Sequence, residues 1–347
     1  MENISVLAID LAKASFQIHG NDKQGKCVVK KALSREKLEA FISLQKPCII
    51  AMEACGSAHF WANKFLRMGH QVRLIAPQFV KPFVLGNKND KNDARAIAEA
   101  AVRPSMHFVA VKSAEQLDLQ AMHRVRQRYV RSRTALCNEI RGLLFEHGIT
   151  IPKNVSSVKK VLVSIVHNNE YSELPRSFRV TLTELSEELQ DIEVRIDRIE
   201  KRLEDFAKSN ATCKRLQSIP GVGLITSTAV VAAVADPKQF KNGRHFAAWA
   251  GLVPKHSGTG GAQNNRVGGI SKKGEPYLRQ LLVHGSRSVI RVVDRREDAG
   301  AAWIKRVRDK SGWNKASVAL ANKNARIIWA ILNSETTFDI KKMAKAV

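Results

Sequence analysis

The strongest constraint on the fold of this chain is a seven-residue apolar repeat in its middle third. Apolar side chains recur at two heptad positions, and charged residues fill most of the others: Leu185, Leu189, Ile192, Ile196, Ile199, Leu203 and Phe206. An a/d repeat of this length predicts a coiled coil. The partner helix can belong to the same chain or to a second protomer. The repeat does not choose between them, and self-association is expected.

The candidate partner within the chain is the segment 113–147. It lacks proline, has few glycines and predicts one long helix. Arg124, Arg128 and Arg131 fall on one face of this helix, with Arg126 and Arg133 adjacent, and no acid lies among the five. The functional interpretation is a ridge that follows a nucleic-acid backbone. The alternative is a solvated helix face.

Short apolar runs alternate with helical segments in the first 110 residues. Strands are expected over 4–9, 48–52 and 71–75, and helices over 34–44 and 57–68. This alternation predicts an α/β domain with a partly parallel sheet.

Four acids stand at the ends of these elements. Asp10 follows the first strand, Glu53 ends a later strand, and Asp90 and Asp93 open a predicted helix. Acids at the carboxyl ends of neighbouring strands can converge, and carboxylate oxygens suit a pair of Mg²⁺ ions. This is the pattern of the RNase-H-like (RuvC-like) nuclease fold. Each acid also has a structural interpretation, as a strand-end turn residue or a helix cap.

The charge balance predicts a polyanionic partner. The chain has 57 Lys and Arg against 32 Asp and Glu, a formal charge of +25, and residues 207–347 alone contribute 25 − 8 = +17. The basic residues are spread through folded segments, which favours nucleic acid over a membrane surface.

The five cysteines form no Cys-x-x-Cys pair, so neither a disulfide framework nor a zinc site is indicated. No signal peptide or membrane span is recognised, and the cytoplasm is the expected compartment.

The last third is expected to be mainly helical. Ile-Pro-Gly-Val-Gly, with Gly221 and Gly223, predicts a helix-hairpin-helix-like turn that can bind phosphate, and an ordinary core connection is the alternative. The Gly-rich stretch 255–282 contains Ser257, which is a turn residue unless a base, a metal or positive charge activates it. Four cations of this stretch are candidates for phosphate binding: Arg266, Lys272, Lys273 and Arg279.

Together these motifs resemble the DEDD transposases of bacterial insertion sequences, recombinases that are guided by a bridge (seeker) RNA. The N-terminal matches are Ala-Ile-Asp10-Leu-Ala-Lys, Met-Glu53-Ala-Cys-Gly and Asn-Asp90-Lys-Asn-Asp93-Ala. The C-terminal matches are Ile-Pro-Gly-Val-Gly, Ala-Gly-Leu-Val-Pro, His-Ser257-Gly and Ile-Ser-Lys-Lys-Gly. The resemblance covers nearly the whole chain, and its specificity lies in the order and spacing of the motifs.

The resemblance implies a RuvC-like catalytic domain over 1–110, a coiled-coil and linker region over 111–208 and a transposase domain over 209–347. It implies that Asp10, Glu53, Asp90 and Asp93 bind Mg²⁺ and that Ser257 attacks a DNA phosphate to form a transient covalent link. It further implies donor and target DNA, a non-coding guide RNA, and dimers that pair as tetramers. The expected location is the bacterial cytoplasm, in association with the nucleoid.

The serine loop departs from the family pattern. Between Pro254 and Ser257 it is shorter than in better-known members, which leaves Ser271 as a second candidate nucleophile. Two other functions stay open: a hydrolytic Holliday-junction-resolvase-like nuclease that uses only the acids, and a non-catalytic nucleic-acid-binding protein.

Overall fold

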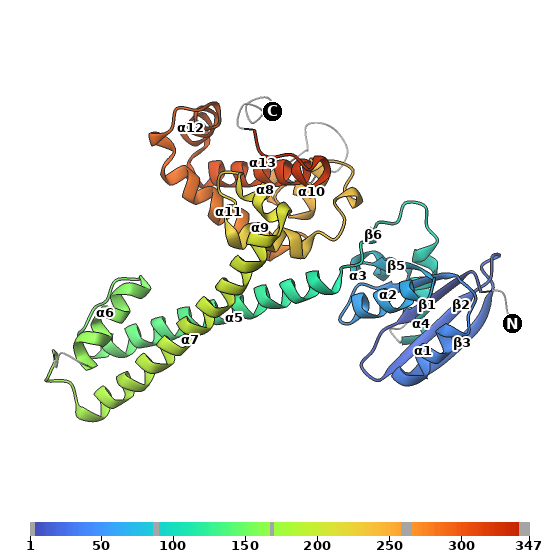
Figure 1. Cartoon of the computed structure of the whole chain (residues 1–347), viewed down its shortest axis with the longest axis horizontal. Helices are drawn as coiled ribbons and strands as arrows, with labels where there is room; N and C mark the ends of the chain where they lie inside the picture. The colour runs from blue at the N-terminus through green and yellow to red at the C-terminus, as the bar shows by residue number, and fades with distance from the viewer. Residues whose placement is uncertain (1–3, 86–89, 167–169, 258–265, 340–347) are drawn as a thin grey trace. The chain divides into compact units, whose positions relative to one another are not determined.

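The computed structural model describes residues 4–85, 90–166, 170–257 and 266–339 (Figure 1). The chain forms two compact units. Unit 1 comprises Met1–Leu117 and Val234–Lys241, and unit 2 comprises Asp118–Ala233 and Asn242–Val347. Most of the central region therefore packs in one unit with the C-terminal helices. The division into three functional parts stays a prediction.

Unit 1 is built on a six-stranded mixed sheet with the strand order β3-β2-β1-β4-β5-β6. The strands are β1 (Val6–Asp10), β2 (Ser15–Asn21), β3 (Cys27–Ser34), β4 (Ile49–Glu53), β5 (Gln71–Ile75) and β6 (Phe108–Val109). β1, β4 and β5 are parallel to one another, while β2, β3 and β6 pair antiparallel with their neighbours. The predicted α/β class with a partly parallel sheet is confirmed.

Side chains alternate between the two faces of this sheet, and each face has its own cover. On one face, Leu7 and Ile9 of β1 are buried with apolar residues of α1 (Arg35–Ser43) and α2 (Ala58–Arg67). On the other face, Val6 and Ala8 are buried with the alanine-rich stripe of α4 (Asp90–Ala101). A short helix, α3 (Pro77–Val80), precedes α4. The face covered by α4 is the one that matters for the acids.

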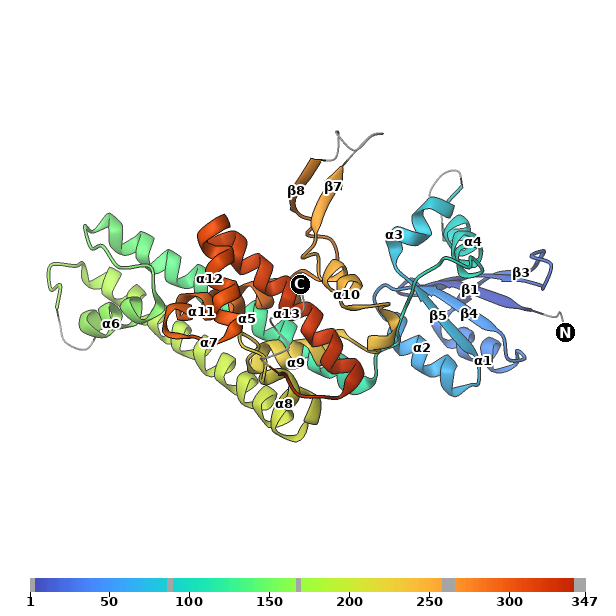
Figure 2. The ribbon, with the colours of Figure 1, turned by 90° about the horizontal axis from the view of Figure 1, so that it is seen from above.

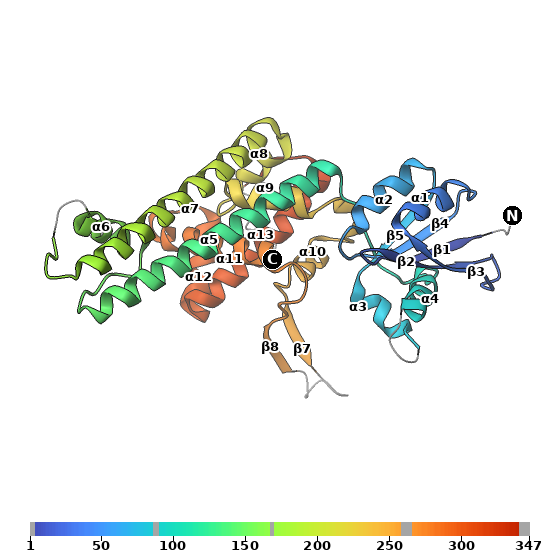
Figure 3. The same cartoon turned by 90° about the horizontal axis from the view of Figure 1, so that it is seen from below.

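The two longest helices, α5 (Ala114–Glu146) and α7 (Arg176–Ser209), pack side by side in opposite directions (Figure 3). Arg126 pairs with Glu200 at 2.6 Å and Arg133 with Glu193 at 4.0 Å. One heptad forward on α5 thus corresponds to one heptad backward on α7. The apolar repeat of α7 is buried against α5, so the same chain supplies the helix partner. Self-association stays a prediction.

The segment 155–166, in the region predicted as coiled coil and linker, forms a helix and not a linker. α6 (Val155–Val166) buries Val158, Leu162 and Ile165 in the same apolar cluster as α5 and α7. These positions are four and three residues apart, which is the spacing of one helical face. The apolar run of this segment is therefore the inner stripe of a third helix.

The rest of unit 2 is mainly helical, as predicted. Its helices are α8 (Ala211–Gln217), α9 (Leu224–Ala233), α10 (Gly243–Trp249), α11 (Pro276–Arg291), α12 (Ala299–Ser311) and α13 (Trp313–Ser334). Between α10 and α11, β7 (Pro254–Ser257) and β8 (Arg266–Ile270) form a hairpin that extends away from the helices of this unit (Figure 2). Short 3₁₀ turns occur at Lys81–Phe83, Pro237–Gln239 and Val293–Arg295. Within the described ranges, no helix is both long enough and apolar enough to span a membrane.

The helical core of unit 2 predicts a large cost for removing one of its buried leucines. Leu189 is 1% exposed, so Leu189→Ala should lower the free energy of unfolding by about 2–5 kcal/mol. Val194, on the same helix, is 53% exposed, and Val194→Ala should change stability by no more than about 0.5 kcal/mol. Urea unfolding followed by tryptophan fluorescence measures both. Equal midpoints for the two variants would contradict this packing.

Candidate active site and nucleic-acid surface

The sheet places Asp10 and Glu53 next to each other at the carboxyl ends of two parallel strands. β1 and β4 are parallel neighbours with Ile9 opposite Met52, so the next residues in register are Asp10 and Glu53, which end the two strands. By the alternation of side chains, both carboxylates lie on the face that α4 covers. Both residues are half-buried. The convergence of these two acids, predicted from strand ends alone, is what parallel pairing produces.

A neighbouring thiol responds to both carboxylates. Burial raises the pKa of Cys55, and the negative charges of Glu53 and Asp10 raise it further. The backbone N–H of Cys55 also donates to the carbonyl oxygen of Glu53 at 2.8 Å, which folds the chain tightly at the end of β4. Both carboxylates thus act electrostatically on the same thiol, in keeping with their neighbouring positions in the strand register.

Helix α4 carries the other two acids. It begins at Asp90, as predicted, and its last turn is held to β5 by Arg73, whose Nη1 donates to the carbonyl oxygen of Ala101 at 2.6 Å. Asp93 is half-buried, and the side chain of Asp90 lies outside the described part. Among the described side chains, no group of three or more His, Cys, Asp or Glu residues is arranged to hold a metal ion. That Asp90 and Asp93 join the first two acids stays a prediction.

Two glycine motifs of unit 2 pack directly on each other at the base of the β7–β8 hairpin. Gly251 has φ +72°, and an added Cβ would lie 2.2 Å from the carbonyl oxygen of Lys273. Gly274 has φ +86°, and an added Cβ would lie 1.8 Å from the carbonyl oxygen of Trp249. Only glycine combines this backbone conformation with so little space. The motifs Ala-Gly-Leu-Val-Pro and Ile-Ser-Lys-Lys-Gly therefore belong together because they form one joint.

Arg279 holds this joint from α11. Its Nη1 donates to the carbonyl oxygens of Ala250 at 3.2 Å and Lys273 at 3.4 Å. Arg279 thus has a structural role that the sequence did not reveal. Lys272 and Lys273 are exposed, as a phosphate-binding surface requires. Their contact with nucleic acid, like that of Arg279 and Arg266, stays a prediction.

The two candidate serines occupy opposite ends of the hairpin. Ser257 is the last residue of β7 and pairs in register with Arg266, and the side chains of both lie outside the described part. Ser271 follows β8 at the base, where its N–H donates to the carbonyl oxygen of Val253 at 2.8 Å. The Ser271 hydroxyl is buried and has no hydrogen-bond partner within the described ranges. A substrate phosphate therefore has poor access to the Ser271 hydroxyl.

The five arginines of α5 between Arg124 and Arg133 divide into two groups. Arg126 and Arg133 turn toward α7 and form the ion pairs that hold the helices together. Arg124, Arg128 and Arg131 are exposed. Arg128 lies over the ring of Tyr129 with its Cζ 4.2 Å from the centroid. The face predicted as a ridge is therefore the face that solvent reaches, while its binding to nucleic acid stays a prediction.

The Pro-Gly-Val-Gly turn joins α8 to α9, as predicted, but one of its glycines serves packing. Gly221 has φ +88°, and an added Cβ would lie 2.9 Å from the carbonyl oxygen of Gly285 on α11. An added Cβ on Gly285 would lie 1.9 Å from the carbonyl oxygen of Gly221. The turn and α11 therefore meet backbone to backbone. Gly223 has open space around its Cα and is the better placed of the two for a phosphate, which stays a prediction for both.

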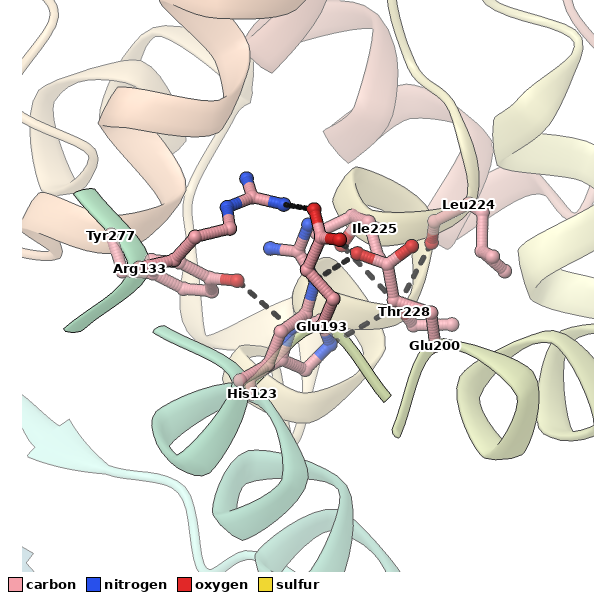
Figure 4. Close-up of polar contacts among 9 residues, drawn as sticks. His123, Arg133, Glu193, Glu200, Leu224, Ile225, Thr228 and Tyr277 are labelled. Atoms are coloured by element: carbon pink, nitrogen blue, oxygen red, sulfur yellow. Dashed lines mark hydrogen bonds and ion pairs between the residues drawn. The ribbon is translucent and has the colours of Figure 1, made fainter. Parts of the chain in front are cut away.

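A buried histidine network links three helices of unit 2 (Figure 4). His123 of α5 contacts the Thr228 hydroxyl through Nε2 and the Tyr277 hydroxyl through Nδ1, each at 3.1 Å. Because Thr228 donates its own proton to the carbonyl oxygen of Leu224 at 2.8 Å, it accepts from Nε2–H, and Nδ1 accepts from Tyr277. Burial, with Arg126 nearby, lowers the pKa of His123 to about 4. His123 and Thr228 are 105 positions apart, and no sequence pattern marked them.

Comparison with known proteins identifies the class. A DEDD family model described as "Transposase" matches residues 7–149, and one described as "Transposase IS116/IS110/IS902 family" matches residues 213–300. The "Probable family 20 transposase" of Pseudomonas aeruginosa is 48% identical over 97% of this chain and 99% of the relative. Transposases for the insertion sequence elements IS1111A of Coxiella burnetii and IS1328 of Yersinia enterocolitica are 44% and 39% identical, over 97% of this chain and 92% and 99% of their own lengths.

These matches define a transposase, an enzyme of DNA strand transfer and recombination. More closely, the chain belongs to the IS116/IS110/IS902 transposase family. The resemblance seen in the sequence motifs is thereby confirmed. DNA is a partner of such an enzyme, and the DEDD domain suggests a divalent metal.

The His123 network predicts acid sensitivity of unit 2. The pKa of the histidine is 6.5 ordinarily and about 4 here, so between these values the unfolded chain binds more protons and stability falls as the pH falls. Stability is fully present above pH 6.5, and the shift of 6.5 − 4 corresponds to at most about 3 kcal/mol. Urea unfolding between pH 4 and 7 should show a shallower pH dependence for His123→Gln.

His59 of unit 1 provides a control, because burial also lowers its pKa to about 4. The single tryptophan of unit 1, Trp61, is separate from the four of unit 2, so the signal of unit 2 is the one to follow. His59→Gln should leave the transition of unit 2 unchanged. An unaltered pH dependence of that transition in His123→Gln would contradict the assignment of a buried neutral histidine.

Proposed function

We propose that this transposase cuts and rejoins DNA through a covalent serine–DNA intermediate. Ser257 is the nucleophile, and a site of four acids holds Mg²⁺ at the reacting phosphate: Asp10, Glu53, Asp90 and Asp93. The observation that carries the proposal is the pairing of Asp10 with Glu53 on one sheet edge, under the helix that Asp90 opens. Family membership supplies DNA strand transfer as the reaction.

The donor set fits a hard divalent cation. Asp10 and Glu53 offer carboxylate oxygens from neighbouring strands, and a shared site between two like charges favours a cation. Asp93, half-buried in the first turn of α4, and Asp90 are the further ligands of the proposal. When bound, the ion supplies positive charge that neutralises the phosphate and orients its oxygens.

The serine step is a transfer between two oxygens at phosphorus. The Oγ of Ser257 forms a bond to the phosphorus, the bond from phosphorus to a deoxyribose oxygen breaks, and the serine proton ends on that leaving hydroxyl. In the reverse step, a deoxyribose hydroxyl of another strand attacks the phosphorus. The bond from phosphorus to the Oγ of Ser257 breaks, and the serine regains its proton from the attacking hydroxyl. The number of phosphodiester bonds is conserved, so no external energy source is needed. The position of Ser257 at the end of β7, across from Arg266, supports this role over the buried Ser271.

Guide RNA and self-association complete the proposal. A net charge of +25 and the exposed arginines of α5 suit a long backbone such as RNA. Sequence choice would come from pairing between guide and DNA, with the protein reading shape and backbone. The active assembly is a dimer or tetramer in which the acids of one protomer meet Ser257 of another. A nucleoid-associated cytoplasmic location follows from these partners.

The test of the nucleophile is a denaturant-resistant protein–DNA adduct. The wild-type chain, incubated with insertion-end DNA and Mg²⁺, should form the adduct, and Ser257→Ala should reduce both adduct and joined product to background. Ser271→Ala is the matched control and should form the adduct at a rate within a few-fold of the wild type. Asp10→Asn should lose the adduct too, because the phosphate would then lack its neutralising site.

Two outcomes would overturn the proposed chemistry. If Ser257→Ala cleaves DNA at the wild-type rate and neither protein forms an adduct, the acids act alone as a hydrolytic nuclease. If Ser271→Ala, and not Ser257→Ala, loses the adduct, the nucleophile is at the base of the hairpin.

The guide RNA is tested by sequencing RNA that co-purifies with the full chain. A structured RNA with loops complementary to two DNA sites is expected. Arg124→Ala combined with Arg131→Ala should lower RNA recovery and reduce the salt dependence of binding, by about 0.7 in log–log slope for each lost single-strand phosphate contact. Arg198→Ala with Arg202→Ala, on the exposed side of α7, is the matched control. Equal losses in both pairs would contradict a specific ridge on α5.

A further inference from the structure

A groove lies beside the arginine face of α5, within unit 2. It has a volume of about 260 Å³ and is bounded by α5, α9 and the start of α11. The α5 wall presents Gln120, Arg124, Gln127 and Arg131, which are spaced four, three and four residues apart and so form one helical stripe. Two cations and two amides therefore alternate along one side of a cavity.

The opposite wall is mostly apolar. α9 contributes alanines that include Ala229 and Ala233, and α11 contributes Pro276 and Tyr277. Small side chains on α9 leave the room that the groove occupies. A flat ring can enter between the stripe of α5 and this wall and replace water on both of its faces.

The groove is preformed rather than loosely closed. His123, beneath the α5 stripe, is 3% exposed and joins α5 to Thr228 of α9 and Tyr277 of α11. All three residues are tied by hydrogen bonds, so the spacing of the three helices is fixed before a ligand enters. Preformed walls reduce the entropy that binding costs.

We propose that this groove binds one unpaired nucleotide of a nucleic-acid strand. The base occupies the groove, and the phosphates on either side of it contact Arg124 and Arg131 at the rim. The inference rests on the proposed function, because it takes the arginine face of α5 as the nucleic-acid ridge. It adds that the ridge reads a strand at a point where one base leaves the stack.

Size and chemistry favour a single nucleotide. The volume is slightly below the ~300–1,000 Å³ of ordinary small-molecule sites, which suits one base and not two stacked ones. Gln127 has amide donors and acceptors that match base edges, and the rim arginines have the planar geometry that suits phosphate. Glu275 also lines the groove and repels a phosphate, so the phosphates belong on the α5 side. A carboxylate there can accept a hydrogen bond from the amino group of a base.

The test compares a duplex that has one unpaired nucleotide with the same duplex fully paired. Fluorescence anisotropy without divalent metal measures the affinity of the full chain for both. DNA duplexes carry an unpaired thymidine and RNA duplexes an unpaired uridine, which separates the two possible sources of the nucleotide. In at least one of these nucleic acids the unpaired form should bind about tenfold tighter.

Two matched substitutions locate the effect. Ala233→Leu fills the groove and should bring the ratio of affinities close to one, with binding of the paired duplex unchanged. Ala121→Leu makes the same change at an exposed position of α5 outside the groove and should keep the ratio. Gln127→Ala, a second groove variant, should lower the ratio in the same direction, and thermal unfolding checks that all variants are folded.

The proposal is overturned if DNA and RNA both give a ratio near one with the wild-type chain, or if Ala233→Leu keeps the preference. Its failure differs from a failure of the proposed chemistry. A loss of nucleotide preference leaves the Ser257 adduct in place, whereas a wrong nucleophile leaves the preference in place.

Discussion

The parallel pairing of β1 with β4 is the contact on which the position of two candidate catalytic acids depends. With Ile9 opposite Met52, the strands end together, and their last residues are Asp10 and Glu53. A shift of one residue in either strand would turn its acid to the face of α1 and α2, where the sheet buries its largest apolar side chains. The register is therefore set by the hydrophobic core, and the two carboxylates are placed by it. The same pairing places two carboxylates side by side at the ends of neighbouring strands.

The basic residues of the chain do two physically different things. Arg126 and Arg133 form ion pairs with Glu200 and Glu193 along the α5–α7 contact, while Arg124 and Arg131 remain exposed beside a groove. The same helix thus carries paired charge on one face and exposed charge on another. Amino-acid composition does not distinguish these arginines. The face of α5 on which each one lies decides whether it forms an ion pair or is exposed. The same holds for Arg279, whose guanidinium holds two carbonyl oxygens inside the unit.

The β7–β8 hairpin is built from two motifs that are separated in the sequence. Gly251 and Gly274 allow two chain segments to meet at backbone contact distance, and Ser271 is buried in that joint. Ser257 lies at the other end of a two-stranded ladder. A rigid base and an extended arm suit a nucleophile that must reach a substrate held elsewhere. Motifs that are separated in the sequence therefore form one structural element.

The sequence by itself determined the features that local period and composition control. Alternating strands and helices gave the mixed α/β class, the heptads gave the long helices, the start of α4 at Asp90 came from helix-forming residues, and the motifs gave the family. Tertiary structure decided the features that depend on partners far along the chain. It decided that α7 pairs with α5 of the same chain and that 155–166 is a third helix of that bundle. It also brought Gly221 against Gly285 and joined His123 to Thr228 and Tyr277. The physical reason is that periodicity fixes which face of an element is apolar, whereas the choice of the partner for that face is a matter of shape and distance in three dimensions.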